Sequence, residues 1–174
     1  MVGEVLGQDA VCLLVRTSQS HIHVGQAART QAFVNGDRRD GHRRVIDEPG
    51  YIGQELVINL RQGETVALEK LVSFYTSRDH ATSEPSLEAG KAVVRAGRFD
   101  LVMAEHVQAW KHLWQRFDVY LQPADPPFRV NVPMLLRLNM LHLLQTMSIN
   151  SIGLDIGAPA RGWTGEAYPG HVCW

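Results

Sequence analysis

The sequence predicts an α+β fold, with a partial antiparallel β-sandwich first and helices after it. Hydrophobic residues alternate with a period of two up to a seam near residues 77–83, and they follow a helical period beyond it. The chain has 174 residues, which is enough for one domain or for a small domain and part of a second.

The first half should contain antiparallel strands within residues 9–76. Strand-like runs such as "VCLLVRT", "HIHVGQA", "QELVINL" and "TVALEKLVSFYTS" are separated by the turn signals "NG" at 35–36, "EPG" at 48–50 and "RQGE". We count roughly five or six strands, a number that is low for a closed sandwich, so only a piece of one is expected.

The first helix is predicted in the stretch "SEPSLEAGKAVVRA". Ser83 is the expected N-cap, and Glu84 and Pro85 would occupy the first turn, where acidic residues and proline are tolerated. Gly97 should interrupt the helical pattern soon afterwards.

A second helix is expected from about Asp100 to Phe117. Its large apolar residues recur at spacings of four and three, which places them on one face and predicts that they pack in a core: Met103, Val107, Trp110, Trp114 and Phe117.

A proline-rich linker and a third helix follow. The run "LQPADPPFRVNVP" has four prolines in thirteen residues, which excludes a regular helix. The next run, Met134–Met147, is apolar nearly all the way round, so it should need burial on most faces and more neighbours than this chain supplies. On it, His142 and Gln145 are expected to be satisfied polar groups in a core rather than pocket residues.

Charge and hydropathy exclude several classes of partner. The 17 basic and 18 acidic residues give a net charge of -1, which indicates neither nucleic acid nor an anionic membrane as a partner. No apolar run approaches the roughly 20 residues of a membrane helix, and the N-terminus lacks a basic leader. The one basic run is interrupted by Asp40 and Gly41, so it is expected to be a solvated loop: Arg38, Arg39, Arg43 and Arg44.

The cysteines and histidines give no metal-binding pattern. Cys12 and Cys173 lie at opposite ends of the chain, and we expect reduced thiols in a cytoplasmic protein. His21 and His23 alternate on a strand without a third ligand nearby, so a solvated strand face is favoured over a metal site. No metal and no cofactor are expected.

The last segment, "NSIGLDIGAPARGWTGEAYPGHVCW", has no sustained period and is rich in glycine, aromatic and polar residues. Long irregular segments of this kind usually build a site. Aromatic faces suit the C–H groups of sugars, and carboxylates and amides suit hydroxyls, so a polar ligand pocket is predicted. A nucleotide site is the weaker alternative, because no glycine-rich fingerprint or P-loop lysine is present.

Two stretches near the C-terminus, "LRLNMLHLLQTMS" and "PARGWTGEAYPGHVCW", resemble the entry to the catalytic domain of glycoside hydrolase family 65. The family's run has the form Pro-Ala-(Arg or Lys)-Gly-Leu-Thr-Gly-Glu-(Gly or Ala)-Tyr-x-Gly-His-x-Phe-Trp-Asp. Here Trp163 replaces the leucine and Cys173 replaces the phenylalanine. The runs "LEKLVSFYTSRD" and "AEHVQAWKHLWQRFDV" are also similar to the family, so the resemblance spans nearly the whole chain.

The resemblance implies a multidomain fragment. Members of the family have an N-terminal β-sandwich, a helical linker and an (α/α)6 barrel that carries the active site. Residues 1–80 would be the C-terminal part of the β-sandwich and residues 81–128 the helical linker. Residues 129–174 would be the start of a truncated (α/α)6 catalytic barrel, with its first helix.

The resemblance also implies an activity. The family holds maltose, kojibiose, nigerose and trehalose phosphorylases and a few hydrolases. The chain would be a fragment of an inverting phosphorylase that uses inorganic phosphate on a trehalose-, maltose- or kojibiose-type disaccharide, giving β-glucose 1-phosphate and glucose. The general-acid glutamate would lie downstream, so this chain alone should be inactive. A trehalase-like hydrolase of the same family and an inert structural remnant are the alternatives, and a homodimer is an option for the full-length protein.

The implied substrate contacts lie at the end of the chain. Trp174 would pack on the glucosyl ring, and Tyr168 would form part of the wall of the same subsite. Arg161 and His171 would either line this subsite or orient the loop that carries it. Glu166 and Thr164 would support the pocket from behind rather than touch the sugar.

Overall fold

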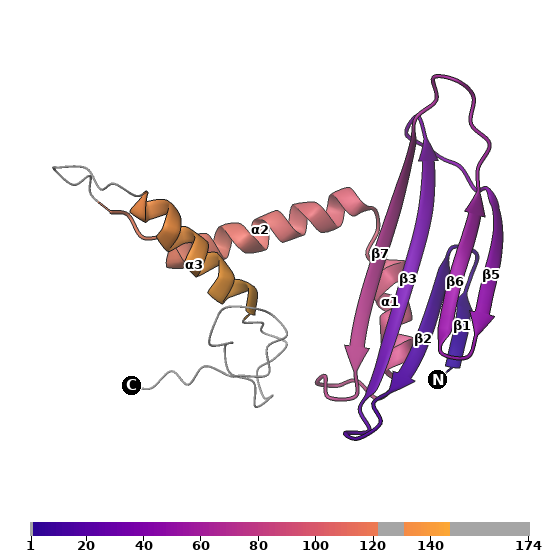
Figure 1. Ribbon diagram of the computed structural model, residues 1–174, viewed down its shortest axis with the longest axis horizontal. Helices are drawn as coiled ribbons and strands as arrows, with labels where there is room; N and C mark the ends of the chain where they lie inside the picture. The colour runs from indigo at the N-terminus through magenta and orange to yellow at the C-terminus, as the bar shows by residue number, and fades with distance from the viewer. Residues whose placement is uncertain (1, 122–130, 147–174) are drawn as a thin grey trace. The chain divides into compact units, whose positions relative to one another are not determined.

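The computed structural model describes residues 2–121 and 131–146, and it divides the chain into two units, residues 1–106 and 107–174. The described residues form seven strands and three helices (Figure 1). The strands are β1 (Val2–Leu6), β2 (Ala10–Arg16), β3 (His23–Val34), β4 (Asp37–Arg38), β5 (His42–Glu48), β6 (Tyr51–Val57) and β7 (Val66–Thr76). The helices are α1 (Pro85–Arg95), α2 (Phe99–Phe117) and α3 (Val132–Thr146).

The main sheet is antiparallel, as predicted. Its order is β1-β2-β3-β4, and β7 pairs with the other edge of β3 over the whole range from Val24↔Thr76 to Val34↔Val66. The predicted turn at Asn35–Gly36 connects β3 to β4, and both residues have positive φ values of 51° and 94°, which Asn and Gly tolerate best. Strand β1 was not among the strands expected from the sequence.

Strands β5 and β6 form a separate two-stranded sheet. The predicted "EPG" turn joins them, with Gly50 at a φ of 81°. The hairpin contacts β1 and β2, where an added Cβ on Gly3 would approach the side chains of Asp47 and Ile52. The "RQGE" segment leads from β6 to β7, which belong to different sheets rather than to one hairpin.

Helix α1 covers the opposite face of the main sheet, behind the strands in the view of Figure 1. The buried core between them contains Cys12, Ala27, Ala89 and Val93. Small side chains let the helix lie close to the strands: a Cβ on Gly25 would be 2.4 Å from the carbonyl carbon of Pro85.

The start of α1 differs from the prediction. Glu84, not Ser83, is the N-cap residue, because Pro85 is the first helical residue and Ser83 precedes it by two positions. No side-chain hydrogen bond caps this helix. Pro85 is at the first helical position, where the backbone N–H has no partner within the helix, so its absence loses no hydrogen bond. The φ of proline is already helical, which favours a helix start at this residue.

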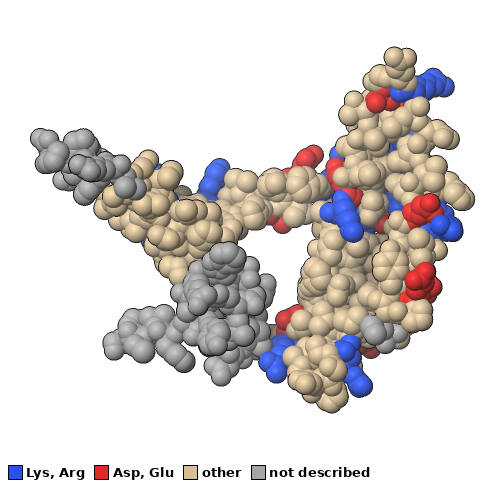
Figure 2. All heavy atoms as spheres, viewed as in Figure 1, with Lys and Arg blue, Asp and Glu red and all other residues tan. Residues whose placement is uncertain are grey.

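The face of β7 that points away from α1 is exposed and mostly apolar. It carries Leu68, Val72 and Phe74, which are 62%, 47% and 62% exposed, together with the exposed Lys70. In Figure 2 the surface over β3 and β7 that faces the viewer is mostly uncharged. The hairpin of β5 and β6 contacts β1 and β2 instead, so it leaves this part of the sheet open.

Helices α2 and α3 follow the predicted ranges closely. Gly97, at a φ of 68°, separates α1 from α2, and Asn131 caps α3 by accepting a hydrogen bond from the Met134 N–H at 3.1 Å. None of the described residues of either helix is buried. The burial predicted for the α2 stripe is therefore not found among the described residues, although the Trp110 and Trp114 rings lie 6.4 Å apart.

The prediction for the two polar residues of α3 was wrong. His142 and Gln145 are both exposed. Among the described residues nothing buries α3, so a core in which these polar groups would be satisfied is not found. Neither α2 nor α3, nor any other described helix, has the length and hydropathy needed to cross a membrane.

Candidate functional site

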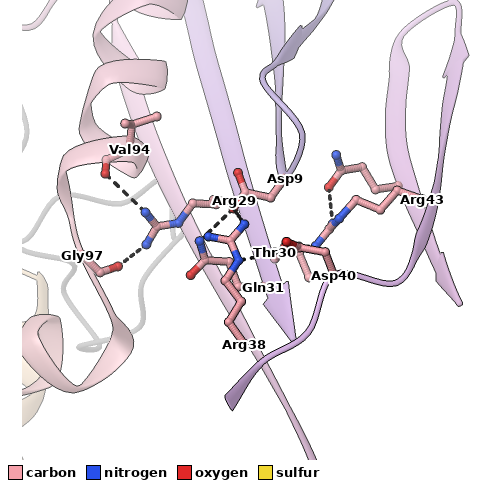
Figure 3. Close-up of polar contacts among 10 residues, drawn as sticks. Asp9, Arg29, Thr30, Gln31, Arg38, Asp40, Arg43, Val94 and Gly97 are labelled. Carbon is pink, nitrogen blue, oxygen red and sulfur yellow. Dashed lines mark hydrogen bonds and ion pairs between the residues drawn. The ribbon is translucent and has the colours of Figure 1, made fainter. Parts of the chain in front are cut away.

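The residues predicted to bind the sugar lie in 147–174, outside the described residues. They are Arg161, Thr164, Glu166, Tyr168, His171 and Trp174. Among the described residues, one set of polar contacts surrounds β3 (Figure 3). Another joins Arg98, in the turn between α1 and α2, to Glu69 of β7.

Arg29 is the one buried charged residue of the described chain, with 8% of its surface exposed. Its guanidinium donates one hydrogen bond to the Val94 carbonyl at 3.3 Å and another to the Gly97 carbonyl. The Val94 carbonyl is among the last of α1, which have no internal helical donors, and the Gly97 carbonyl lies in the turn that follows the helix. Arg29 therefore fixes the end of α1 to the sheet, and Figure 3 shows it reaching from β3 toward that end.

A second set of contacts connects β3 to its other neighbours. Asp9 accepts hydrogen bonds from Gln31 Nε2 at 2.8 Å and from Arg38 at 3.2 Å, and Arg38 also donates to Asp40 at 3.3 Å. These groups pin the β3–β4 hairpin to the loop before β2.

Arg43 connects the β5–β6 hairpin to the main sheet. It donates to the Thr30 carbonyl at 2.6 Å and to Gln54 Oε1 at 3.2 Å. The Nε2 atom of Gln54 is buried and has no hydrogen-bond partner among the described residues. Arg43 thus adds polar contacts to the packing of the hairpin on β1 and β2, beside a buried amide nitrogen that has no partner within the described part of the chain.

The prediction that the basic run is a solvated loop was right for Arg39, which is exposed and lies outside the strands. Arg38 and Arg44 are exposed as well, but with Arg43 they lie in strands rather than in a loop. Arg38 lies in β4, and Arg43 and Arg44 lie in β5; each has a defined acceptor, with Arg44 paired to Glu55 at 2.6 Å.

The turn between α1 and α2, residues 96–98, carries a further cluster. Arg98 pairs with Glu69 at 2.7 Å, and its guanidinium carbon lies 4.0 Å from the centroid of the Phe33 ring. The second carboxylate oxygen of Glu69 accepts a hydrogen bond from the Phe99 N–H at 3.3 Å. The hydrogen bond from Arg98 is the main cause that lowers the pKa of Glu69, and the Phe99 N–H and the charge of Arg29 act in the same direction.

The lowered pKa of Glu69 predicts a pH-dependent stability. Because the folded-state pKa lies below the unfolded-state value of about 4.3, ionised Glu69 stabilises the fold above that pH, and this contribution is lost as pH falls through the folded-state pKa. Glu69→Gln should therefore lower the urea midpoint at pH 6 and change it much less at pH 3. Equal midpoint shifts at the two pH values would contradict this assignment.

A recess of about 430 Å³ lies between β1 and α1. Its apolar lining comes from Leu6, Leu87 and Val94, and charged groups of both signs surround them: Glu4, Glu84, Lys91 and Arg95. The mixture of charges defines no particular ligand.

The described residues offer no reactive centre. Burial, together with the charge of Glu4, raises the pKa of the Cys12 thiol, which lies 3.6 Å from the Ser86 carbonyl, so this thiol is poorly suited as a nucleophile. In the described ranges no group of three His, Cys, Asp or Glu side chains could hold a metal ion. The contacts above serve to hold β3, the hairpin and the α1–α2 turn together.

Sequence reasoning missed Arg29 and Glu69. Both lie at alternating strand positions that face α1, between small or apolar residues such as Ala27 and Leu71. A charged residue at a buried strand position is a signal for a specific partner, but the identity of the partner depends on the register of β3 and β7 and on the packing of α1.

Comparison with protein families gives one match, to the family described as glycosyl hydrolase family 65, N-terminal domain, over residues 2–113. This range contains both described sheets, α1 and most of α2.

Several curated relatives align over nearly the whole chain. An uncharacterized glycosyl hydrolase of Mycobacterium tuberculosis is 41% identical over 98% of this chain and 12% of its own length. A kojibiose phosphorylase of Halothermothrix orenii is 26% identical over 98% of this chain and 22% of its own length. An alpha,alpha-trehalose phosphorylase of Thermoanaerobacter brockii is 27% identical over 70% of this chain and 15% of its own length. The chain thus spans less than a quarter of each of these relatives.

Proposed function

Since the chain belongs to glycoside hydrolase family 65, we propose that the protein cleaves an α-glucosidic disaccharide with inorganic phosphate. The products would be β-glucose 1-phosphate and glucose. The observation that carries this proposal is the family match over residues 2–113, and relatives named as kojibiose and trehalose phosphorylases support it.

The proposed organisation assigns residues 1–80 to the β-sandwich, 81–128 to the helical linker and 129–174 to the start of the catalytic (α/α)6 barrel. The order of strands up to Thr76 followed by α1, α2 and α3 agrees with this sequence of segments. The match to the family's N-terminal domain extends to residue 113, so that domain includes α1 and most of α2. In this scheme the described sheet is a scaffold, and the chemistry belongs to residues outside the described ranges.

The proposed chemistry is one inverting displacement. A glutamic acid protonates the glycosidic oxygen, a phosphate oxygen attacks the anomeric carbon from the opposite face, and the bond to the leaving glucose breaks. Phosphate is already an anion, so no base has to activate it, and the acid contributes on the order of 10²–10⁴-fold. We expect this glutamate beyond residue 174, so the 174-residue chain alone should be inactive.

The substrate-binding part of the proposal concerns the end of the chain. Trp174 would pack against the glucosyl ring, with Arg161, Tyr168 and His171 around its hydroxyls. Glu166 and Thr164 would hold the surrounding backbone. Charged groups form the stronger hydrogen bonds to hydroxyls in such a pocket.

A hydrolase of the same family is the second candidate, favoured by the name of the 41% identical relative, a glycosyl hydrolase. A water-using enzyme needs a second carboxylate to activate the water, roughly 6.5–9.5 Å from the acid. The two activities differ in their requirement for phosphate.

The test is an assay of the protein expressed from its complete coding sequence. Trehalose, maltose and kojibiose are each incubated with the protein in phosphate and in phosphate-free buffer, and release of glucose is followed. We expect glucose release from one of the three only when phosphate is present. Release at the same rate in phosphate-free buffer would reject the phosphorylase and support the hydrolase.

A further inference from the structure

The α1–α2 turn (residues 96–98) is tied to two neighbouring strands of the main sheet. Arg29 of β3 binds the carbonyls of Val94 and Gly97, and Glu69 of β7 binds Arg98 and the Phe99 N–H. In the β3–β7 register Arg29 is opposite Leu71 and Glu69 is opposite Gln31, so Arg29 and Glu69 are diagonal neighbours on the face that carries α1.

The two side chains act on different ends of the turn. Arg29 satisfies carbonyls at the end of α1, and Glu69 satisfies the first amide of α2. Gly97, between these two points, has a φ of 68°, a conformation that residues with a side chain rarely adopt. The direction in which the chain leaves α1 is thus set by one glycine and by contacts on both sides of it.

We propose that Arg29 and Glu69 are positioning residues that hold the α1–α2 turn against the sheet and fix where α2 begins. The chain continues through α2 from residues 1–106 into residues 107–174. Loss of either side chain would let the turn and the first residues of α2 open while the sheet stays folded. This proposal does not depend on the enzymatic activity proposed above.

The pair of Arg44 and Glu55 provides a matched comparison. It is also an Arg–Glu pair, at 2.6 Å, but both of its side chains are more exposed than those of Arg98 and Glu69. It connects β5 to β6 within one hairpin, and its carboxylate accepts no backbone N–H of a helix among the described contacts. Exposed ion pairs of this kind contribute little to stability. Glu69 differs because its carboxylate also fixes a backbone amide of α2.

The test is hydrogen–deuterium exchange of the 174-residue chain followed by mass spectrometry. In Glu69→Gln and in Arg29→Met, backbone amides in residues 96–102 should exchange about tenfold faster, the change expected from loss of one charge-assisted hydrogen bond. Amides of β3 and β7 should accelerate by no more than the loss of global stability that urea denaturation of Glu69→Gln measures, and they should stay much better protected than residues 96–102. Glu55→Gln should leave residues 96–102 unchanged.

Two results would overturn the proposal. One is an unchanged exchange rate in residues 96–102 of Glu69→Gln. The other is an exchange free energy in residues 96–102 that equals that of β3 and β7 in the variant, which would show that the turn opens only when the whole sheet unfolds. If Arg29→Met does not fold, Glu69→Gln alone decides between these outcomes.

Discussion

Replacing Gly25 with alanine is expected to destabilise the sheet and α1 by about 3 kcal/mol or more. A Cβ at position 25 would lie 2.4–2.5 Å from the backbone carbonyl carbon and oxygen of Pro85 and from the Ser86 nitrogen. These are backbone atoms at the start of α1, so they cannot move aside by a change of rotamer. Urea denaturation followed by circular dichroism measures the loss.

Gly3→Ala is the matched control for this substitution. Gly3 is also in a strand of the main sheet, but its nearest neighbours are the ends of the Asp47 and Ile52 side chains, at 2.9 and 3.2 Å. Those groups can shift, and alanine restricts the unfolded chain, so we expect a change of less than about 1 kcal/mol. Similar losses in the two variants would show that α1 does not approach β3 as closely as described.

Replacing Trp174 with alanine is expected to lower kcat/KM for the disaccharide about 100-fold. Full burial of a large apolar side chain against a ligand contributes up to about 3 kcal/mol, and a loss of that size in the transition state corresponds to roughly this factor. The measurement uses the protein expressed from its complete coding sequence, with its preferred disaccharide and inorganic phosphate.

Trp163→Leu is the control for the Trp174 variant. Leucine is the residue that the family pattern has at position 163. This change therefore removes another tryptophan of the same C-terminal segment and restores the residue of the family pattern. We expect kcat/KM to stay within about threefold of the wild-type value. An unchanged kcat/KM in Trp174→Ala would remove Trp174 from the sugar subsite.

Local features of the fold were predictable from the sequence. The turns at Asn35–Gly36 and Glu48–Gly50 and the break at Gly97 were confirmed, since the residue types at these positions favour backbone conformations that other residues avoid. The helices α2 and α3 were also predicted close to their bounds, because both have long apolar patterns.

Pairing and packing could not be predicted in the same way. Periodicity identifies β6 and β7 as strands, yet it does not reveal that they belong to different sheets, since the partner of a strand depends on residues far away in the sequence. The strand β1 was missed because it is short and contains Gly3. The basic run that was predicted as a loop could not be assigned to β4 and β5, because the pairing of those strands also depends on residues far away in the sequence.

The functional residues fall into two groups, those that a sequence motif can identify and those that depend on strand pairing and packing. The residues that would bind the sugar were proposed from a family motif in 159–174, and they stay predictions because they lie outside the described residues. The contacts of Arg29, Glu69 and Arg43 became visible only once the register of the strands and the position of α1 were known.

The most direct test of the proposed activity is the anomeric configuration of the product. The protein expressed from its complete coding sequence is mixed with its disaccharide and inorganic phosphate, and the products are followed by phosphorus and proton NMR. We predict β-glucose 1-phosphate, formed in equal amount to the glucose released. Formation of α-glucose 1-phosphate, or release of glucose with no phosphate consumed, would contradict inverting phosphorolysis.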